Sequence, residues 1–262
     1  MNLLIDWGNT QLKFICVSTL SQQSIAESEV HICVDLQALK AQLGALGFSN
    51  IDKVLVSSVR DDETNQLLTK ELSLFCQEII FAKTSKDACG IECAYEEPQY
   101  LGIDRWLAVI AGSQHFSDRI DPVEANKNII GVISVGTAIT LDLVSEKAHL
   151  GGHILPGQGL MFNCLKQTGR VWASETQATA EKTSLGQSTS TCVAAGIDAA
   201  IEGYLSNTIK AFENEHQIEQ WLIHGGGGAY WKDRLSASID KLIFEPKLVF
   251  EGLDLWYQEN QS

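Results

Sequence analysis

The stretch LLIDWGNTQLKF, residues 3–14, places an aspartate and a tight small-residue turn between two apolar runs. Gly-Asn between apolar runs is a hairpin signal, so we predict strands over 2–6 and 11–18, joined through Trp7-Gly8-Asn9-Thr10. A glycine turn can also direct backbone N–H groups at phosphate oxygens without cationic side chains. Taken alone, the stretch therefore fits either an ordinary hairpin or one half of a phosphate site.

A second stretch, NIIGVISVGTAITLDLV at 128–144, repeats the same layout of strand, small-residue turn and strand. Its turn, Ser134-Val135-Gly136-Thr137, is one residue shorter than Asp6-Trp7-Gly8-Asn9-Thr10. Such an internal echo indicates two units of similar topology. A nucleotide clamp built from two similar units needs one phosphate-binding turn from each, so the pair favours a nucleotide site over two unrelated hairpins.

The segments around these turns alternate between strand and helix patterns, which indicates an α/β protein. DKVLVSSV at 52–59 is typical of a buried strand, and GIDRWLAVIAGSQHF from Gly102 is typical of a helix. The polar segment SDRIDPVEANKN at 117–128 separates two strongly patterned halves. We therefore expect two domains, residues 1–118 and 119–262.

Composition excludes several classes of partner. The 262 residues carry a formal net charge of −14, from 33 acidic and 19 basic side chains. A broad attraction to nucleic acid or to an anionic membrane is therefore not expected. No apolar run approaches the roughly 20 residues that span a bilayer, and the seven cysteines include no CxxC pair, so we expect reduced thiols and a cytoplasmic protein.

Side chains near the two turns could serve phosphate chemistry. Thr10 and Thr137 offer hydroxyl donors, Lys13 offers a point charge, and Asp6 could hold Mg²⁺ at nucleotide phosphates. Asp104, in GIDRW, is the best candidate for a general base toward a substrate hydroxyl. The same residue also fits a helix N-terminal aspartate that the helix dipole stabilises.

Two histidines have simpler interpretations than catalysis. His224 precedes the run Gly225 to Gly228 and is interpreted as a strand-end histidine beside the glycines, with a general base as the alternative. His153 is interpreted as a filler residue within a turn formed by GGHILPG at 151–157.

Five motifs in order along the chain resemble those of the type III pantothenate kinases. They are Asp6-Trp7-Gly8-Asn9-Thr10, Gly102-Ile103-Asp104-Arg105, Gly136-Thr137-Ala138, GGHILPG at 151–157 and the late glycine run after an apolar strand. Together they span residues 6 to 228, and the combination is far more specific than any one motif.

The resemblance implies two ribonuclease-H-like domains of the acetate and sugar kinase, Hsp70 and actin superfamily around an ATP cleft, in a cytoplasmic homodimer. It implies ATP-dependent phosphorylation of pantothenate to 4'-phosphopantothenate, the first step of coenzyme A biosynthesis, with Asp104 as the base. It also implies Mg²⁺ and a monovalent cation, K⁺ or NH₄⁺. The residues implied to contact ATP are Asp6, Trp7, Gly8, Asn9, Thr10, Gln11, Leu12, Lys13 and Thr137, and those implied to contact pantothenate are Tyr95, Gly102, Ile103, Asp104, Arg105 and Thr189.

The sequence departs from the family pattern at one important position. The family's second phosphate motif begins with an aspartate that ligates the monovalent cation, whereas this chain has Ser134. A hydroxyl is a weaker ligand than a carboxylate, so the cation requirement is in doubt and Ser134 is not counted as a metal ligand.

Two other functions share parts of this pattern. The loss of a family metal ligand leaves open a non-catalytic nucleotide-binding regulatory protein of the same fold, similar to a Bvg accessory factor. A related sugar or acetate kinase or an actin-like ATPase would share the cleft, but not the pair GIDRW and GGHILPG.

Overall fold

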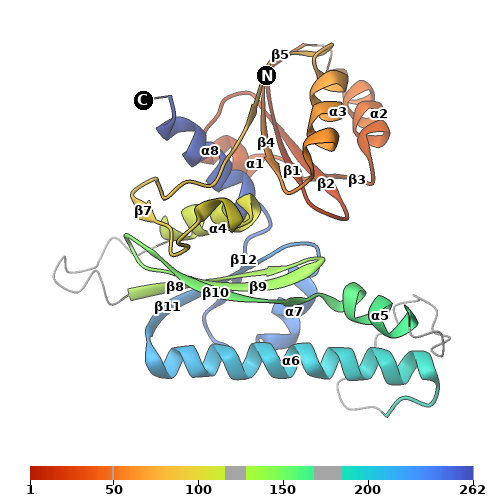
Figure 1. The fold of residues 1–262 in the computed structure, drawn as a ribbon, viewed down its shortest axis with the longest axis vertical. Helices are drawn as coiled ribbons and strands as arrows, with labels where there is room; N and C mark the ends of the chain where they lie inside the picture. The colour runs from red at the N-terminus through yellow and green to blue at the C-terminus, as the bar shows by residue number, and fades with distance from the viewer. Residues whose placement is uncertain (49, 116–127, 168–184, 262) are drawn as a thin grey trace.

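The structure, a computed structural model, describes residues 1–48, 50–115, 128–167 and 185–261. Within these residues the larger strands form two five-stranded sheets with the orders β3-β2-β1-β4-β5 and β10-β9-β8-β11-β12. In the first sheet β1 pairs antiparallel with β2 and parallel with β4. In the second sheet β8 pairs in the same way with β9 and β11. The α/β class is confirmed, and the echo seen in the sequence is a repeat of topology (Figure 1).

The elements of the first half surround the first sheet. Its strands are β1 (Asn2–Trp7), β2 (Leu12–Val17), β3 (His31–Cys33), β4 (Ile51–Ser58) and β5 (Cys76–Phe81), and its helices are α1 (Gln22–Glu27), α2 (Leu36–Ala45) and α3 (Asp62–Leu72). A small hairpin, a 3₁₀ turn and a helix follow: β6 (Asp87–Ala88), β7 (Ile91–Glu92), η1 (Pro98–Tyr100) and α4 (Ile103–Ser113).

The elements of the second half surround the second sheet, except for the last helix. They are β8 (Asn128–Val135), β9 (Ala138–Val144), β10 (His149–Pro156), α5 (Gln158–Gln167), α6 (Thr189–Glu215), β11 (Gln217–His224), α7 (Gly228–Leu235), β12 (Leu242–Phe244) and α8 (Leu248–Glu259). The domain boundary expected near residue 118 lies outside the described residues.

The two sheets and their helices form stacked layers (Figure 1). Helices α2 and α3 cover the outer face of the first sheet, and α5, α6 and α7 lie beyond the second. Between the sheets lie α4 and α8, which pack on each other. Helix α8 also contacts β1 and β4, while α4 contacts β4, β8 and β9. The last helix of the chain therefore returns to the first sheet.

Alternation along the strands decides which side chains face this central layer. In β1, Leu3 and Ile5 belong to the outer core of the first sheet, the cluster formed with α2 and α3, whereas Leu4 packs in the central layer with α4 and α8. In β8, Ile133 belongs to the outer core of the second sheet and Val132 to the central layer. Asp6 and Ser134, two residues further on from Leu4 and Val132, therefore face the central layer from opposite sheets.

The two turns differ more in length than the sequence indicated. Four residues, Gly8 to Gln11, separate β1 from β2, whereas two residues, Gly136 and Thr137, separate β8 from β9. The predicted difference of one residue was wrong, because Gln11, which was predicted to begin the second strand, belongs to the turn before β2.

The interpretation of GGHILPG as a turn was also wrong. These residues continue β10, which pairs with β9 as far as Pro156, and only Gly157 lies beyond the strand. His153 is exposed in this strand, and its Nδ1 lies 3.0 Å from the Tyr204 hydroxyl of α6. Glycine at 152 is needed because a Cβ there would lie 2.2 Å from the Leu141 carbonyl oxygen.

The contact between α4 and α8 depends on Gly252. A Cβ at this position would lie 2.0 Å from the backbone oxygen of Leu107 in α4. We expect Gly252→Ala to force the two helices apart and to lower the free energy of unfolding by about 1–3 kcal/mol. Urea unfolding followed by circular dichroism measures the change.

Gly203→Ala in α6 is the matched control, because a Cβ at Gly203 meets nothing within 4 Å. Alanine in a helix interior is more favourable than glycine by about 0.5–1 kcal/mol, so this variant should be slightly more stable. Equal effects of the two substitutions would contradict the close approach of α4 and α8.

Candidate active site

The two glycine turns meet in space. The Oγ1 atoms of Thr10 and Thr137 lie 2.6 Å apart, so a hydroxyl of one turn donates to the other. The Gly8 N–H donates to the Gln11 carbonyl and the Gly136 N–H to the Ala138 carbonyl, which closes each turn. The turns predicted to act together are therefore adjacent.

The late glycine run and Arg60 border this meeting point. A Cβ at Gly226 would lie 3.8 Å from Oε1 of Gln11, and the Gly227 N–H donates to the Val135 carbonyl. Arg60 donates to the Asn9 carbonyl at 2.8 Å, with its guanidinium 5.9 Å from the centre of the Trp7 ring. Arg60, which the sequence did not single out, thus supports the first turn.

Asp6 lies at the base of the first turn and faces the central layer. Its neighbours in the sheet are Lys13 on β2 and Ser57 on β4, and the Ser57 hydroxyl donates to its Oδ1 at 3.4 Å. Burial raises the pKa of Asp6 to about 6, although the positive charge of Lys13 opposes the shift. The negative charge of Asp104 raises this pKa further, so the two carboxyl groups share one electrostatic site.

Asp104 occupies the first turn of α4. The backbone N–H of Arg105 donates to its Oδ1 at 2.9 Å. Burial raises the pKa of Asp104, and the Arg105 N–H and guanidinium oppose that shift. Gly102 precedes the helix, where a Cβ would lie 2.7 Å from Oδ1 of Asp104. The carboxyl group therefore needs glycine at 102 in order to fold back over the helix start.

Arg105 is held by a buried network that the sequence analysis missed. Its Nε and Nη2 donate to Oδ2 and Oδ1 of Asp142 at 3.0 and 2.6 Å, and its Nη1 donates to the Tyr95 hydroxyl at 3.0 Å. His149 Nε2 lies 2.9 Å from the same Asp142 Oδ1. One feature of the sequence could have indicated this network. Asp142 is a lone carboxylate inside the apolar run AITLDLV of β9, and a buried carboxylate normally has a charged or hydrogen-bonding partner.

Three of the other predicted site residues are core residues. Trp7 and Leu12 belong to the outer core of the first sheet, and Ile103 packs in the central layer. Their side chains therefore pack in the core rather than at the turns. Asn9, Thr10 and Gln11 are exposed in the first turn.

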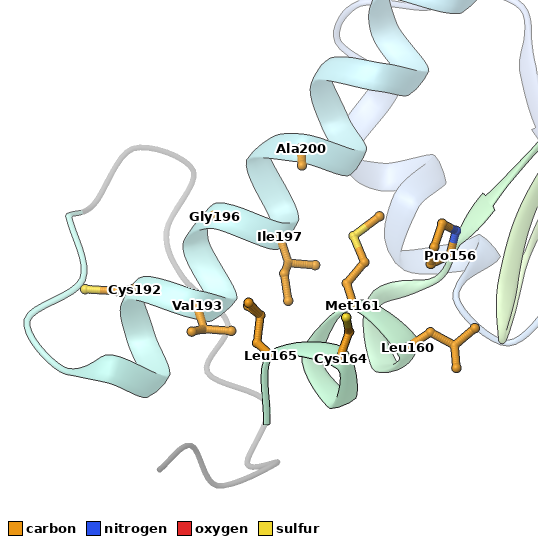
Figure 2. Close-up of a pocket in the computed structure, with 10 residues that line it drawn as sticks. All are labelled: Pro156, Leu160, Met161, Cys164, Leu165, Cys192, Val193, Gly196, Ile197 and Ala200. Carbon is orange, nitrogen blue, oxygen red and sulfur yellow. The ribbon is translucent and has the colours of Figure 1, made fainter. Parts of the chain in front are cut away.

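Thr189 lies apart from the other predicted substrate residues. It is exposed in the first turn of α6, beside α5 and away from α4 (Figure 1). Next to it, α5 and α6 line an open apolar cavity of about 780 Å³. Figure 2 shows Met161 and Ile197 pointing into this cavity from the two helices. Within one copy of the chain, Thr189 thus belongs to a different surface from Tyr95 and Asp104.

His224 ends β11 directly before the glycines, as its interpretation as a strand-end histidine requires. It is buried, and burial lowers its pKa to about 3, with the positive charge of Lys13 acting in the same direction. Its Nε2 has no hydrogen-bond partner among the described residues.

The residues around Asp6 fit a nucleotide-bound Mg²⁺. Among the described residues no group of three or more His, Cys, Asp and Glu side chains could hold a metal ion. Mg²⁺ is commonly bound by one or two carboxylates together with waters and substrate phosphates, which does not require such a group. A partly buried carboxyl group at the base of a phosphate turn, as at Asp6, is a suitable donor.

The residues around Ser134 do not fit a monovalent cation. Its partners in the sheet are Thr140 on β9 and His224 on β11, a hydroxyl and an imidazole. K⁺ and NH₄⁺ are bound best by oxygen atoms that carry negative charge or strong dipoles, and no carboxylate occupies either neighbouring register position.

Known proteins resemble this chain in sequence and in fold. The family model for type III pantothenate kinase matches residues 2–211. The type III pantothenate kinase of Acinetobacter baumannii strain ACICU is 31% identical over 254 residues, covering 96% of this chain and 95% of the relative. That of Pseudoalteromonas translucida strain TAC 125 is 34% identical over 267 aligned residues, covering 100% and 98%.

Solved structures share the fold at lower identity. A Baf family protein from Campylobacter jejuni is 21% identical with a TM-score of 0.55, covering 99% of this chain and 98% of its own. The ethanolamine utilization protein EutJ from Carboxydothermus hydrogenoformans is 10% identical with a TM-score of 0.52, covering 97% and 89%. These likenesses concern the fold alone, whereas the matched family model and the two relatives show that this chain belongs to the type III pantothenate kinase family.

Proposed function

We propose that this protein transfers the γ-phosphoryl group of ATP to the primary hydroxyl of pantothenate, the first step of coenzyme A biosynthesis. Membership of the family supports the reaction. The observation that carries it in this chain is Asp104, a partly buried carboxyl group with a raised pKa, which interacts electrostatically with Asp6 at the base of the first turn. The family resemblance also leads us to propose a cytoplasmic enzyme.

The phosphates of ATP would lie against the backbone of the two turns, Gly8 to Gln11 and Gly136 to Thr137, with Thr10, Thr137 and Lys13 as further donors. Separation of the Thr10 and Thr137 hydroxyls frees both for phosphate oxygens. Asp6 would hold Mg²⁺, which neutralises charge on the phosphates when it is bound. Most of the rate acceleration would come from positioning and charge stabilisation.

In the reaction, the pantothenate hydroxyl oxygen forms a bond to the γ-phosphorus and the bond to the β–γ bridging oxygen breaks, so that ADP leaves. The hydroxyl proton passes to the carboxylate of Asp104. A raised pKa suits this role, because a general base works best when its pKa lies near the operating pH.

Tyr95 and Arg105 would form the wall of the pantothenate pocket. Three nitrogens of the Arg105 guanidinium already donate to Asp142 and Tyr95. The Tyr95 oxygen accepts one of these bonds, which leaves its own O–H free to donate to a substrate. We therefore assign Arg105 the role of orienting Tyr95 and the start of α4.

We propose that Thr189 reaches a substrate held by a second copy of the chain. Thr189 begins α6, whose start lies beside α5 and away from α4, the helix that carries Asp104 (Figure 1). The adjacent cavity is lined with apolar groups, including the exposed side chain of Leu160. An open apolar surface of this kind is stabilised when another surface covers it. A homodimer provides that cover.

Replacement of the base tests the catalytic proposal. Asp104→Asn keeps the size of the side chain but cannot accept the proton, so kcat should fall by about 10²- to 10⁴-fold. Formation of ADP and phosphopantothenate is measured directly, while calorimetry should find ATP binding unchanged and thermal melting should find a folded protein. ATP binding by the wild type without turnover of pantothenate would instead support the non-catalytic alternative.

Removal of the charge on Asp142 tests the network around Arg105. Asp142→Asn leaves a buried guanidinium without its counter-ion, which should cost about 3–5 kcal/mol in free energy of unfolding. The measurement is urea unfolding.

Glu78→Gln is the control for Asp142→Asn, because Glu78 pairs with Lys53 at the surface and should contribute little. An Asp142→Asn protein as stable as the wild type would contradict the assignment of this pair as a support of α4.

Disruption of the apolar surface tests the dimer. The wild type should sediment as a dimer, and Leu160→Glu should give monomers with strongly reduced activity because Thr189 then has no substrate to contact. Leu74→Glu, at a residue 78% exposed just before β5, is the control and should remain dimeric. A monomer with full specific activity would contradict the proposal.

A further inference from the structure

Ser134 and Asp6 occupy equivalent positions in the two sheets. Each is the last residue but one of its strand, and each faces the central layer. Asp6 has Lys13 and Ser57 beside it in the sheet, whereas Ser134 has Thr140 and His224. The first turn therefore has an acid at its base, and the second has only neutral hydroxyls and an imidazole.

The carboxylate nearest in sequence to this second base is already occupied. Asp142 lies two residues after Thr140 on the same face of β9. Its Oδ1 accepts from Arg105 and lies within hydrogen-bond distance of His149, and its Oδ2 accepts from Arg105. An Asp142 oxygen could bind a cation at Ser134 only after Arg105 or His149 had moved away, which would leave a buried charge without its partner.

A positive side chain acts on this region from the first turn. The Lys13 charge acts on His224, the direct neighbour of Ser134 across the sheet, and the negative charge of the paired Asp142 acts on His224 in the opposite direction. Two residues before Lys13, the side chain of Gln11 lies against the glycine run that follows His224. A K⁺ ion at Ser134 would therefore bind in the field of the Lys13 charge and without a carboxylate at either neighbouring register position, and like charges repel in a partly buried site.

We propose that the second phosphate turn of this protein works without an activating monovalent cation, because Lys13 supplies positive charge there and Ser134 replaces the acid that would bind the ion. The proposal distinguishes this chain from the family pattern in which an aspartate stands at this position. What this proposal says about turnover rests on the proposed kinase activity, whereas what it says about nucleotide binding does not.

Activity in defined salts is the first test. Product formation is followed directly by chromatography of ADP, because coupling enzymes can themselves require K⁺, and ionic strength is held constant with choline chloride, KCl or NH₄Cl. The wild type should change by less than twofold among the three salts. Activation of tenfold or more by KCl or NH₄Cl over choline chloride would overturn the proposal.

Two substitutions at Ser134 sharpen the test. Ser134→Asp restores the acid and should make turnover depend on KCl by fivefold or more, while Ser134→Ala should stay as insensitive to the salt as the wild type. Circular dichroism establishes that each variant is folded. A folded Ser134→Asp protein that ignores KCl would show that this residue does not decide the requirement, and would also overturn the proposal.

Calorimetry of ATP binding separates this proposal from the proposed function. The dissociation constant for MgATP should agree within twofold between choline chloride and KCl. If pantothenate is not phosphorylated in any salt but ATP binding is equally strong in both, the kinase function fails and the cation independence stands. Binding that is tenfold tighter in KCl would contradict the independence whatever the turnover.

Discussion

Helix α4 must bury its side chains against both sheets at once, and the rest of the molecule is arranged around that constraint. Ten of its eleven residues are buried, and Asp104 is the exception. One side packs on β4 and α8, the other on β8 and β9. Since apolar surface is stabilised by removal from water on every side, the chain closes this layer with its last helix. The approach of Gly252 to the Leu107 backbone makes that closure possible.

The same helix carries the candidate chemistry, so packing and function are coupled through it. Asp104 and Arg105 are neighbours in the first turn, yet the Asp104 charge acts on Asp6 of the first sheet and Arg105 pairs with Asp142 of the second. A buried ion pair contributes little net stability, but it holds its partners in one geometry. Desolvation raises the pKa of the partly buried carboxyl groups of Asp6 and Asp104, and such perturbed groups are concentrated at functional sites.

Sequence reasoning succeeded where a local pattern has a single structural meaning. The turn at Gly8, the helix after Gly102 and the duplicated strand layout were predicted because alternation and glycine turns are local signals. Reasoning failed where strand length decided the outcome. GGHILPG contains glycine and proline, yet pairing with β9 keeps it extended as far as Pro156, because a neighbouring strand supplies hydrogen bonds that no local rule includes.

The sequence by itself determined that the chain has two similar halves, that each presents a glycine turn, and that Asp104 begins a helix, since these features depend on neighbours within a few residues. Only the tertiary structure decided that Thr10 meets Thr137, that Asp142 pairs with both Arg105 and His149, and that the Lys13 charge acts on His224. Residues from both sheets and from α4 converge there from distant parts of the chain. Their electrostatic interactions depend on distance and burial, and neither quantity can be read from spacing along the sequence.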